Sequence, residues 1–162
     1  MDTKTTGIPY EIRWARAEEW IPAIRMIWQT FLRYEGKDYS EEGIRNFFNF
    51  ITGGELYALF LKGEYPLMVA LDMGMIIGAG SVRNGNHLSL LFVEEAYHHR
   101  GVGSMILGKL CAYLEKERGQ HYMTVQAAPY AVDFYRKQGF RAICPEAEYR
   151  GIRVTPMRKN FE

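Results

Sequence analysis

Between residues 87 and 126 the sequence changes from a strand-like pattern to a helix-like pattern and back, and this order constrains the fold most. The segment HLSLLFV, residues 87–93, is short and apolar, as expected of a buried strand. A second strand pattern, HYMTVQ, occupies residues 121–126. The stretch between them carries apolar residues at helical spacing: Ile106, Leu107, Leu110 and Leu114. A whole helix, ending near Gly119, thus separates the two strands, so we expect them to run parallel in one sheet.

The remaining chain adds strands and helices in mixed order. Ser40 precedes Glu41 and Glu42, a pattern typical of a helix start because the hydroxyl caps the helix and the acids complement its dipole. Two apolar runs flank Asp72, Met73 and Gly74, which indicates a hairpin. We expect the other strands at residues 11–15, on both sides of that hairpin, from 140 and near 151–157, and the other helices at 18–36, 44–51 and 130–138. The predicted fold class is α/β (α+β).

Length and composition limit the possible functions. A chain of 162 residues with 48% hydrophobic content is long enough for one core and too short for two ordinary ones, so we expect a single domain over residues 1–162. The formal net charge is +1, which provides no overall attraction for nucleic acid or an anionic membrane. Cys111 and Cys144 belong to no metal-binding motif, and the sequence lacks an apolar leader or membrane-spanning run, so we expect a cytoplasmic protein without a metal site.

The segment HHRGVGS, residues 98–104, lies where the central helix begins. The first turn of a helix has unpaired N–H groups and a partial positive charge, and glycines allow a ligand to approach the backbone. A phosphate group is the expected ligand for such a turn, although isolated Gly-x-Gly pairs also occur in ordinary turns. The sequence has neither a GxxxxGK[ST] loop nor a third glycine followed by an acid, which excludes a standard P-loop and a dinucleotide fold.

Two motifs together give this chain a recognisable resemblance. HHRGVG, at residues 98–103, is followed about thirty residues later by AVDFYRKQGF, at residues 131–140. The chain resembles the GNAT superfamily of acetyl-CoA-dependent N-acyltransferases from about Glu11 to Met157. Two positions depart from the family's pattern: His98 stands where Gln or Arg is usual, and Ala128 where many members have Asn.

The resemblance implies a fold and a cosubstrate. The fold is a mixed central sheet of about six to seven strands, flanked by about four helices, with the parallel fourth and fifth strands splayed apart. Acetyl-CoA is the implied cosubstrate: main-chain groups at the end of the fourth strand hold the pantetheine arm and acetyl carbonyl, and N–H groups of the glycine turn hold the pyrophosphate. The implied binding residues are Leu91, Phe92, Val93, His98, His99, Arg100, Gly101, Val102, Gly103 and Ser104.

The resemblance also implies a catalytic role for Tyr135, as the phenol that delivers a proton to the departing thiolate. Phe134 and Phe140, on either side of it, are more typical of core positions. The general base stays unassigned at this point, because the strand at 121–126 has no carboxylate. The remaining candidates are Asp72, His87, Glu94 and Glu95.

The expected reaction is acetyl transfer to a primary amine of a small molecule or peptide by direct attack in a ternary complex. The junction of the first two helices carries Tyr34, Glu35, Asp38 and Tyr39, which are suited to binding an amine through aromatic and carboxylate contacts. The final segment, GIRVTPM at 151–157, makes a homodimer through strand pairing possible.

Two other interpretations remain open. One is a non-catalytic acyl-CoA-binding sensor on the same fold, which the departures at His98 and Ala128 favour and Tyr135 opposes. The other is an unrelated α/β fold in which the glycines only form a turn.

Overall fold

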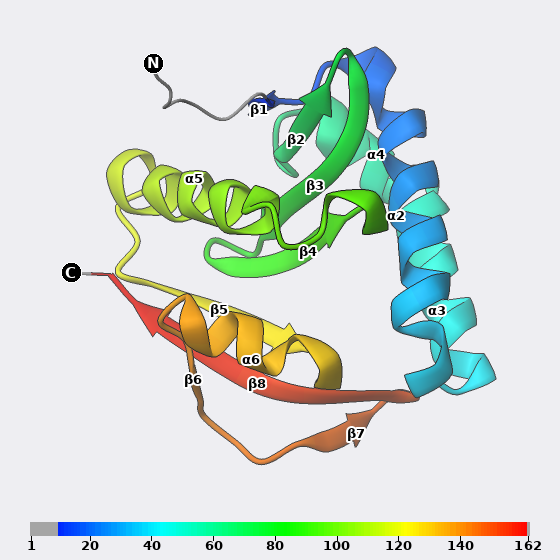
Figure 1. Ribbon diagram of the computed structural model, residues 1–162, viewed down its shortest axis with the longest axis vertical. Coiled ribbons are helices and arrows are strands. Elements are labelled where there is room, and N and C mark those ends of the chain that lie inside the picture. The colour runs from blue at the N-terminus through cyan, green and yellow to red at the C-terminus, as the bar shows by residue number, and fades with distance from the viewer. Residues whose placement is uncertain (1–9, 162) are drawn as a thin grey trace.

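A mixed sheet of eight strands runs through the molecule, with helices on both faces (Figure 1). The structure, a computed structural model, describes residues 10–161. The strands are β1 (Glu11–Trp14), β2 (Leu67–Asp72), β3 (Met75–Arg83), β4 (His87–Val93), β5 (Tyr122–Ala127), β6 (Arg141–Ala142), β7 (Ala147–Tyr149) and β8 (Ile152–Asn160). The α-helices are α2 (Trp20–Tyr34), α3 (Glu41–Thr52), α4 (Gly54–Leu61), α5 (Val102–Glu117) and α6 (Val132–Lys137). Short 3-10 turns are η1 (Ala17–Glu19), η2 (Gly36–Asp38), η3 (Glu95–Tyr97) and η4 (Pro129–Ala131).

The predicted mixed α/β architecture is confirmed, including the parallel β4–β5 pair on either side of α5. Ser40 caps α3 as expected, since its Oγ accepts a hydrogen bond of 3.0 Å from the N–H of Gly43. The hairpin turn also lies at Met73 and Gly74, both with positive φ. Three details differ from the expectation: α4 and β7 were not predicted, and β8 extends to Asn160 instead of ending near residue 157.

Both faces of the sheet are covered at β2, which explains why this strand is apolar from Leu67 to Leu71. Met68 and Ala70 belong to the core cluster that contains the stripe of α5. Val69 and Leu71 belong to the cluster on the opposite face, which packs against α2, α3 and α4. Because successive side chains of a strand point to opposite faces, a strand covered on both sides has no polar face to present.

Helix α5 lies unusually close to the sheet where it crosses β3. A Cβ atom added at Gly80 would stand 2.8 Å from Cγ2 of Ile106 and 3.1 Å from Cδ1 of Leu110. Gly80 has an ordinary backbone conformation, so glycine is needed here for close packing. The position of α5 along β3, and hence of the turn that precedes it, depends on this contact.

Strand β4 pairs with β5 only through its first two residues. The register joins His87 to Thr124 and Leu88 to Val125, and beyond Leu88 the two strands diverge. This divergence is the splay that the sequence resemblance implied. A bulge adds to it: the β3–β4 register skips Ser89, since Val82 faces Leu88 and Ser81 faces Leu90. Such an extra residue bends the strand that carries it.

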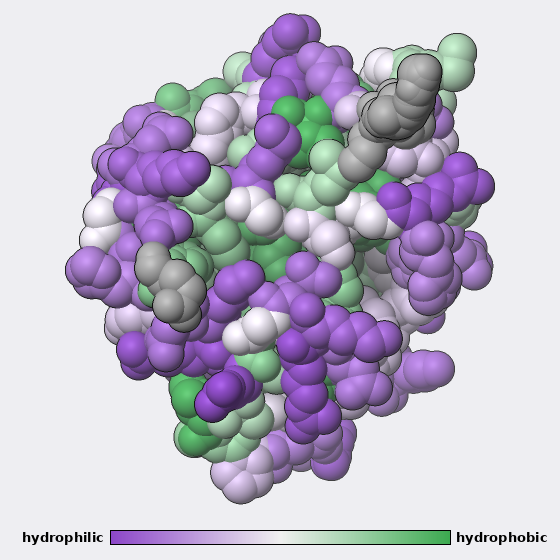
Figure 2. Space-filling view, turned by 60° about the vertical axis from the view of Figure 1, so that its left-hand side comes forward, coloured by the Kyte–Doolittle hydropathy of each residue, from purple (hydrophilic) through white to green (hydrophobic). Residues whose placement is uncertain are grey.

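Strand β8 lies inside the sheet rather than at its edge. One of its edges pairs with β5, and the other pairs with β6 and β7. A homodimer therefore remains a prediction, and the final strand offers it little free edge. Among the described residues, no helix is both long enough and apolar enough to cross a membrane. Hydrophilic side chains cover most of the face seen in Figure 2, with apolar residues showing between them near its centre.

The close approach of α5 predicts a sharp difference between two glycine substitutions. Gly80→Ala should lower the free energy of unfolding by about 1–3 kcal/mol, because the new methyl group overpacks a buried contact. Gly108→Ala, on α5 itself and with open space around its Cβ position, should be neutral or stabilising by up to about 1 kcal/mol. Urea denaturation of both variants measures this, and equal effects would contradict the packing argument.

Candidate functional site

A cavity of about 490 Å³ opens where β4 and β5 separate. Its lining combines residues of β4 and β5 with residues from α3, α6, η4 and β8. It also includes Glu35, which lies between α2 and η2, and Tyr135 of α6. The divergence of two parallel strands thus brings together side chains that are far apart in the sequence.

The main chain of β4 faces this opening at alternate residues. The N–H of Glu94 donates to the carbonyl oxygen of Ile77 on β3 at 2.8 Å. In an antiparallel ladder the residues that bond to the partner strand alternate, so Phe92 also directs its main-chain groups to β3. Leu91 and Val93 direct theirs to the opposite side, where β5 has moved away. Of the three β4 residues predicted to bind pantetheine, Leu91 therefore has both main-chain groups available and Val93 its N–H, while the side chain of Phe92 is buried in the core.

His98 is engaged with the end of β4. Its Nε2 donates to the carbonyl oxygen of Val93 at 2.6 Å, and because a carbonyl can only accept, Nε2 carries the proton. The His98 ring also lies 5.0 Å from the ring of Tyr34 on α2, centroid to centroid. His98 therefore ties α2 to the end of β4 next to the glycine turn.

The glycine turn has free N–H groups at the start of α5. Gly101, with φ of 81°, precedes the helix, and its carbonyl accepts from the N–H of Met105 at 3.0 Å. The N–H groups of Val102, Gly103 and Ser104 precede this bond and have no partner within the helix. The side chain of Val102 is buried, so the turn is fixed to the core while its N–H groups point past the helix end.

Two further contacts connect the turn to neighbouring elements. A Cβ at Gly103 would lie 3.4 Å from Cζ of Phe134 and 3.7 Å from Cγ2 of Val93, so a larger side chain here would press against both and displace the turn. Ser104 Oγ accepts a 2.9 Å bond from Nε2 of Gln138, which holds the end of α6 next to α5. These features fit the pyrophosphate of a coenzyme A thioester, which requires several N–H donors and a backbone without side chains.

The remaining predicted residues of the turn, His99 and Arg100, are exposed. His99 adopts a positive φ of 64°. Arg100 lies against aromatic side chains: its Nη1 donates to the Tyr10 hydroxyl at 3.3 Å, and its Cζ is 5.6 Å from the Tyr97 ring centroid.

Tyr135 is buried in the wall of the cavity, with 6% of its surface exposed. Burial raises the pKa of its phenol, and the nearby charge of Glu35 raises it further. The hydroxyl has no hydrogen-bond partner within residues 10–161. It is therefore a protonated donor, free to bond to a molecule in the cavity. The expected core position of Phe140 is also confirmed, and Phe134 packs against the same core cluster.

Glu35 is the most unusual ionisable group in the cavity. It is only 9% exposed, and its two carboxylate oxygens accept hydrogen bonds from Tyr39 at 3.4 Å and from Tyr130 at 3.2 Å. Burial raises the pKa of Glu35 from 4.5 to about 7, Asp38 adds to this rise, and the two tyrosine bonds oppose it. No cation of the described chain forms an ion pair with it. A buried carboxylate without a positive partner is a site for a cationic ligand or a proton.

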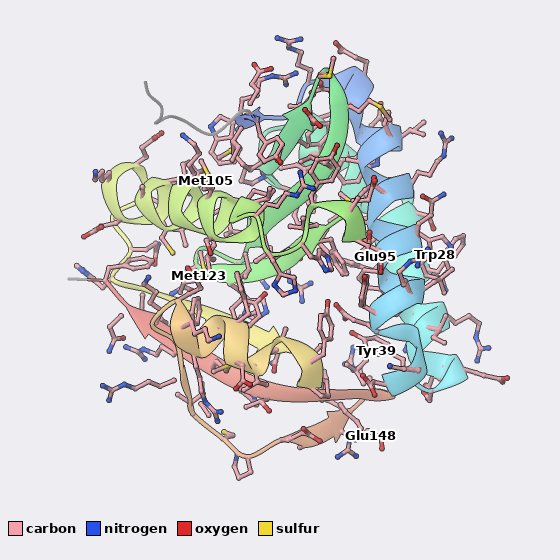
Figure 3. All side chains as sticks on the ribbon, viewed as in Figure 1. Trp28, Tyr39, Glu95, Met105, Met123 and Glu148 are labelled. Carbon is pink, nitrogen blue, oxygen red and sulfur yellow. The ribbon has the colours of Figure 1, made fainter. Side chains whose placement is uncertain are left out.

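The four base candidates have different surroundings, and only His87 lines the cavity. Its Nδ1 lies 2.7 Å from Thr124 Oγ1, and burial, with a contribution from Arg83, lowers its pKa. Asp72 accepts a bond from Tyr97 at 2.6 Å, and Glu95 pairs with Arg33 at 2.8 Å beside α2 (Figure 3). Glu94 is exposed and does not line the cavity.

Of the residues predicted to bind the amine, Glu35 and Tyr39 line the cavity, whereas Tyr34 and Asp38 do not. Sequence reasoning missed Tyr130, the partner of Glu35 from 95 positions further along the chain. It stands one residue before the AVDFYRKQGF motif, and only the fold brings it to Glu35. Within residues 10–161, no group of three or more His, Cys, Asp or Glu side chains is arranged to hold a metal ion.

Comparisons with known proteins agree with this geometry. A family model described as an acetyltransferase (GNAT) domain matches residues 35–161. No curated protein sequence matches the chain. Among solved structures, a GCN5-related N-acetyltransferase from Rhodopseudomonas palustris aligns with a TM-score of 0.80 at 22% identity, covering 98% of this chain and 100% of that one.

Two structures solved with a bound coenzyme share the same fold. The PaiA N-acetyltransferase from Thermoplasma acidophilum, in complex with coenzyme A, aligns with a TM-score of 0.76 at 17% identity, covering 95% of this chain and 100% of its own. YncA from Salmonella typhimurium, solved with its cofactor acetyl-CoA, aligns with a TM-score of 0.68 at 16% identity, covering 94% of both chains.

The buried carboxyl of Glu35 predicts a specific dependence of stability on pH. The folded protein binds the Glu35 proton more tightly than the unfolded chain does. The contribution of this carboxyl to the free energy of unfolding is therefore full below pH 4.5 and is lost as pH rises through about 7. Glu35→Gln should remove up to about 3 kcal/mol of this dependence, as measured by urea denaturation across that range. Glu117→Gln, an exposed carboxyl at the end of α5, is the control. An unchanged pH profile in Glu35→Gln would contradict the argument.

Proposed function

The chain belongs to the GNAT acetyltransferase family, and on this basis we propose that it is an N-acetyltransferase that transfers an acetyl group from acetyl-CoA to a primary amine. The acceptor is a small molecule or peptide, and the amine attacks the thioester directly in a ternary complex. The observation that carries this proposal is the position of Glu35 and Tyr135 in one cavity, beside the unpaired main chain of β4.

Two backbone features support acetyl-CoA as the cosubstrate, which supplies the activated acetyl thioester. The N–H groups of Val102, Gly103 and Ser104 are free to bind its pyrophosphate at the start of α5. The main-chain groups of Leu91 and the N–H of Val93 are free to pair with the amide groups of the pantetheine arm, much as an added strand would, while the Val93 carbonyl is bonded to His98. The thioester then reaches the cavity at the point where β4 and β5 separate.

Glu35 is suited to bind the amine and to accept its proton. An alkylammonium ion has a pKa of about 10, and an ordinary glutamate is too weak a base to deprotonate it readily. The rise in the pKa of Glu35 from 4.5 to about 7 reduces the cost of this transfer by about 3 kcal/mol. Tyr39 and Tyr130 hold the two carboxylate oxygens in place. Glu35 thereby fills the role of general base that the sequence left unassigned.

Tyr135 is suited to act as the general acid. As the amine nitrogen bonds to the acetyl carbon, the carbon–sulfur bond breaks and the electron pair leaves on sulfur. The phenol, protonated because burial raises its pKa, donates its proton to that thiolate. Cys111 is a poor nucleophile for a covalent route, since burial raises the pKa of its thiol and it does not line the cavity.

Titration calorimetry with acetyl-CoA is the first test of this proposal. We expect the wild type to bind acetyl-CoA with a micromolar Kd. Desulfo-CoA keeps the pantetheine arm and should also bind, whereas ATP lacks that arm and should not bind if pantetheine contributes. Gly103→Val should weaken binding at least about tenfold, because its side chain would press against Phe134 and Val93 and displace the turn. Gly108→Ala, on the exposed side of the same helix, should bind normally. No binding at millimolar concentration would contradict the assignment of the cosubstrate site.

Replacing Tyr135 by Phe tests the general acid. We expect kcat to fall by roughly 100-fold or more, while acetyl-CoA affinity stays within about twofold of the wild type. Tyr113→Phe, on the far end of α5, is the matched control. Wild-type protein that binds acetyl-CoA but acetylates no amine would favour the sensor interpretation instead.

Replacing Glu35 by Gln tests the general base. In the wild type, kcat/KM should rise with pH through about 7, because Glu35 must be ionised to accept a proton. Glu35→Gln should lose this limb of the pH profile and at least about 100-fold in rate. A variant that keeps both the limb and the rate would show that another group is the base.

A further inference from the structure

We propose that the amine acceptor carries an anionic group, a carboxylate or a phosphate, several bonds from its amine, and that Arg83 binds this group at the far end of the cavity. This inference rests on the proposed function and specifies its substrate class. It follows from how charge is distributed along the cavity wall.

The cavity has a negative end near the C-terminal end of β4. Glu35 is the only carboxylate in its lining among the described residues. It follows Tyr34, whose ring lies against His98, and His98 in turn bonds to Val93 at the end of β4. The amine therefore binds at the end where the main chain of β4 is exposed to the thioester.

The cavity has a positive end near the start of β4. Arg83, the last residue of β3, lines the cavity and faces His87, the first residue of β4, across the ladder. Leu91 lies four positions beyond His87, a distance of about 13 Å along β4. Among the described residues, Arg83 forms no ion pair with Glu35 and is not among the charges that shift the pKa of Glu35.

Neither end is neutralised by the described part of the chain. Arg83 forms no ion pair there; its Cζ lies 5.2 Å above the ring centroid of Phe50, which positions the guanidinium without satisfying its charge. Arg150 is a second cation in the lining, on the side of the cavity next to Ser40, whose N–H donates to the carbonyl oxygen of Gly151 at 2.9 Å. Its Cζ lies 5.2 Å from the ring centroid of Tyr149, and it is not among the charges that shift the pKa of Glu35. The charges that act on Glu35 include no arginine, whereas Arg83 acts on His87.

A ligand that satisfies both ends has an ammonium group at one end and an anion at the other. A diamine, polyamine or aminoglycoside would bring a second cation toward Arg83, and like charges repel. A simple amino acid is too short, because one carbon separates its two charged groups. The fitting class comprises ω-amino acids, short peptides with a free carboxylate, and aminoalkyl phosphates.

Four acceptors of equal chain length test this proposal: hexylamine, ε-aminohexanoate, ω-aminohexyl phosphate and hexamethylenediamine. Initial acetylation rates are measured with acetyl-CoA, and binding to the CoA-saturated protein is measured by calorimetry. We expect kcat/KM for the carboxylate or the phosphate to exceed that for the diamine by roughly tenfold at low salt. This preference should shrink at about 0.5 M salt, because exposed charges are screened. The better of the two anionic acceptors identifies the group that Arg83 prefers.

Substitutions of Arg83 connect the preference to that residue. Arg83→Gln should raise KM for the anionic acceptors roughly three- to fivefold with kcat unchanged, and Arg83→Glu should reverse the order so that the diamine is preferred. Arg25→Gln, which removes an exposed arginine of α2 outside the cavity, should change neither.

A wild-type preference for the diamine, or an Arg83→Glu variant with unchanged preference, would overturn the proposal. If acetyl-CoA binds but no acceptor is acetylated, the proposed function fails, and calorimetry still decides this inference. Binding of ε-aminohexanoate that is weakened in Arg83→Gln supports it, and binding that is absent or independent of Arg83 rejects it.

Discussion

The separation of β4 from β5 is the constraint on which the candidate site depends. Only His87 and Leu88 of β4 pair with β5, so the main-chain groups of Leu91 and the N–H of Val93 have no partner strand on that side. A buried main-chain group without a hydrogen-bond partner costs about 1–3 kcal/mol. The open arrangement is held from outside: β3 fixes one edge of β4, while β8 fixes the far edge of β5. A ligand with amide groups supplies the missing hydrogen-bond partners. The same main-chain atoms of β4 therefore recognise the ligand and become paired when it binds.

Burial in the cavity wall disfavours charged side chains, and the same effect gives Glu35 and Tyr135 their different roles as base and acid. Glu35 and Tyr135 share one low-dielectric wall, and burial raises the pKa of both. For the carboxyl, the shift brings a weak base into the neutral range, whereas for the phenol it preserves a proton that is needed later. Two groups shifted in the same direction therefore take opposite roles, because their ordinary pKa values lie on opposite sides of neutrality.

The sequence predicted those features whose signal is local, and missed those that arise from distant contacts. Glycine spacing and helical periodicity located the turn before α5, and Ser40 located the start of α3. The segment that forms α4 is apolar on nearly all sides, so it lacks a helical stripe, and the exposed β7 lacks alternation. Glu35 was named as an amine ligand, but its basicity depends on burial and on Tyr130, which no local pattern connects to it.

The position of β8 has a consequence for how the protein folds. Strands β1 to β4 and helix α5 all precede β5 in the chain and can assemble before it is complete, whereas β5 receives its main partner only when residues 152–160 exist. The wall that carries β5 and α6 is thus completed last, and until then the unpaired edge of β5 is the part of the molecule most exposed to pairing with another chain.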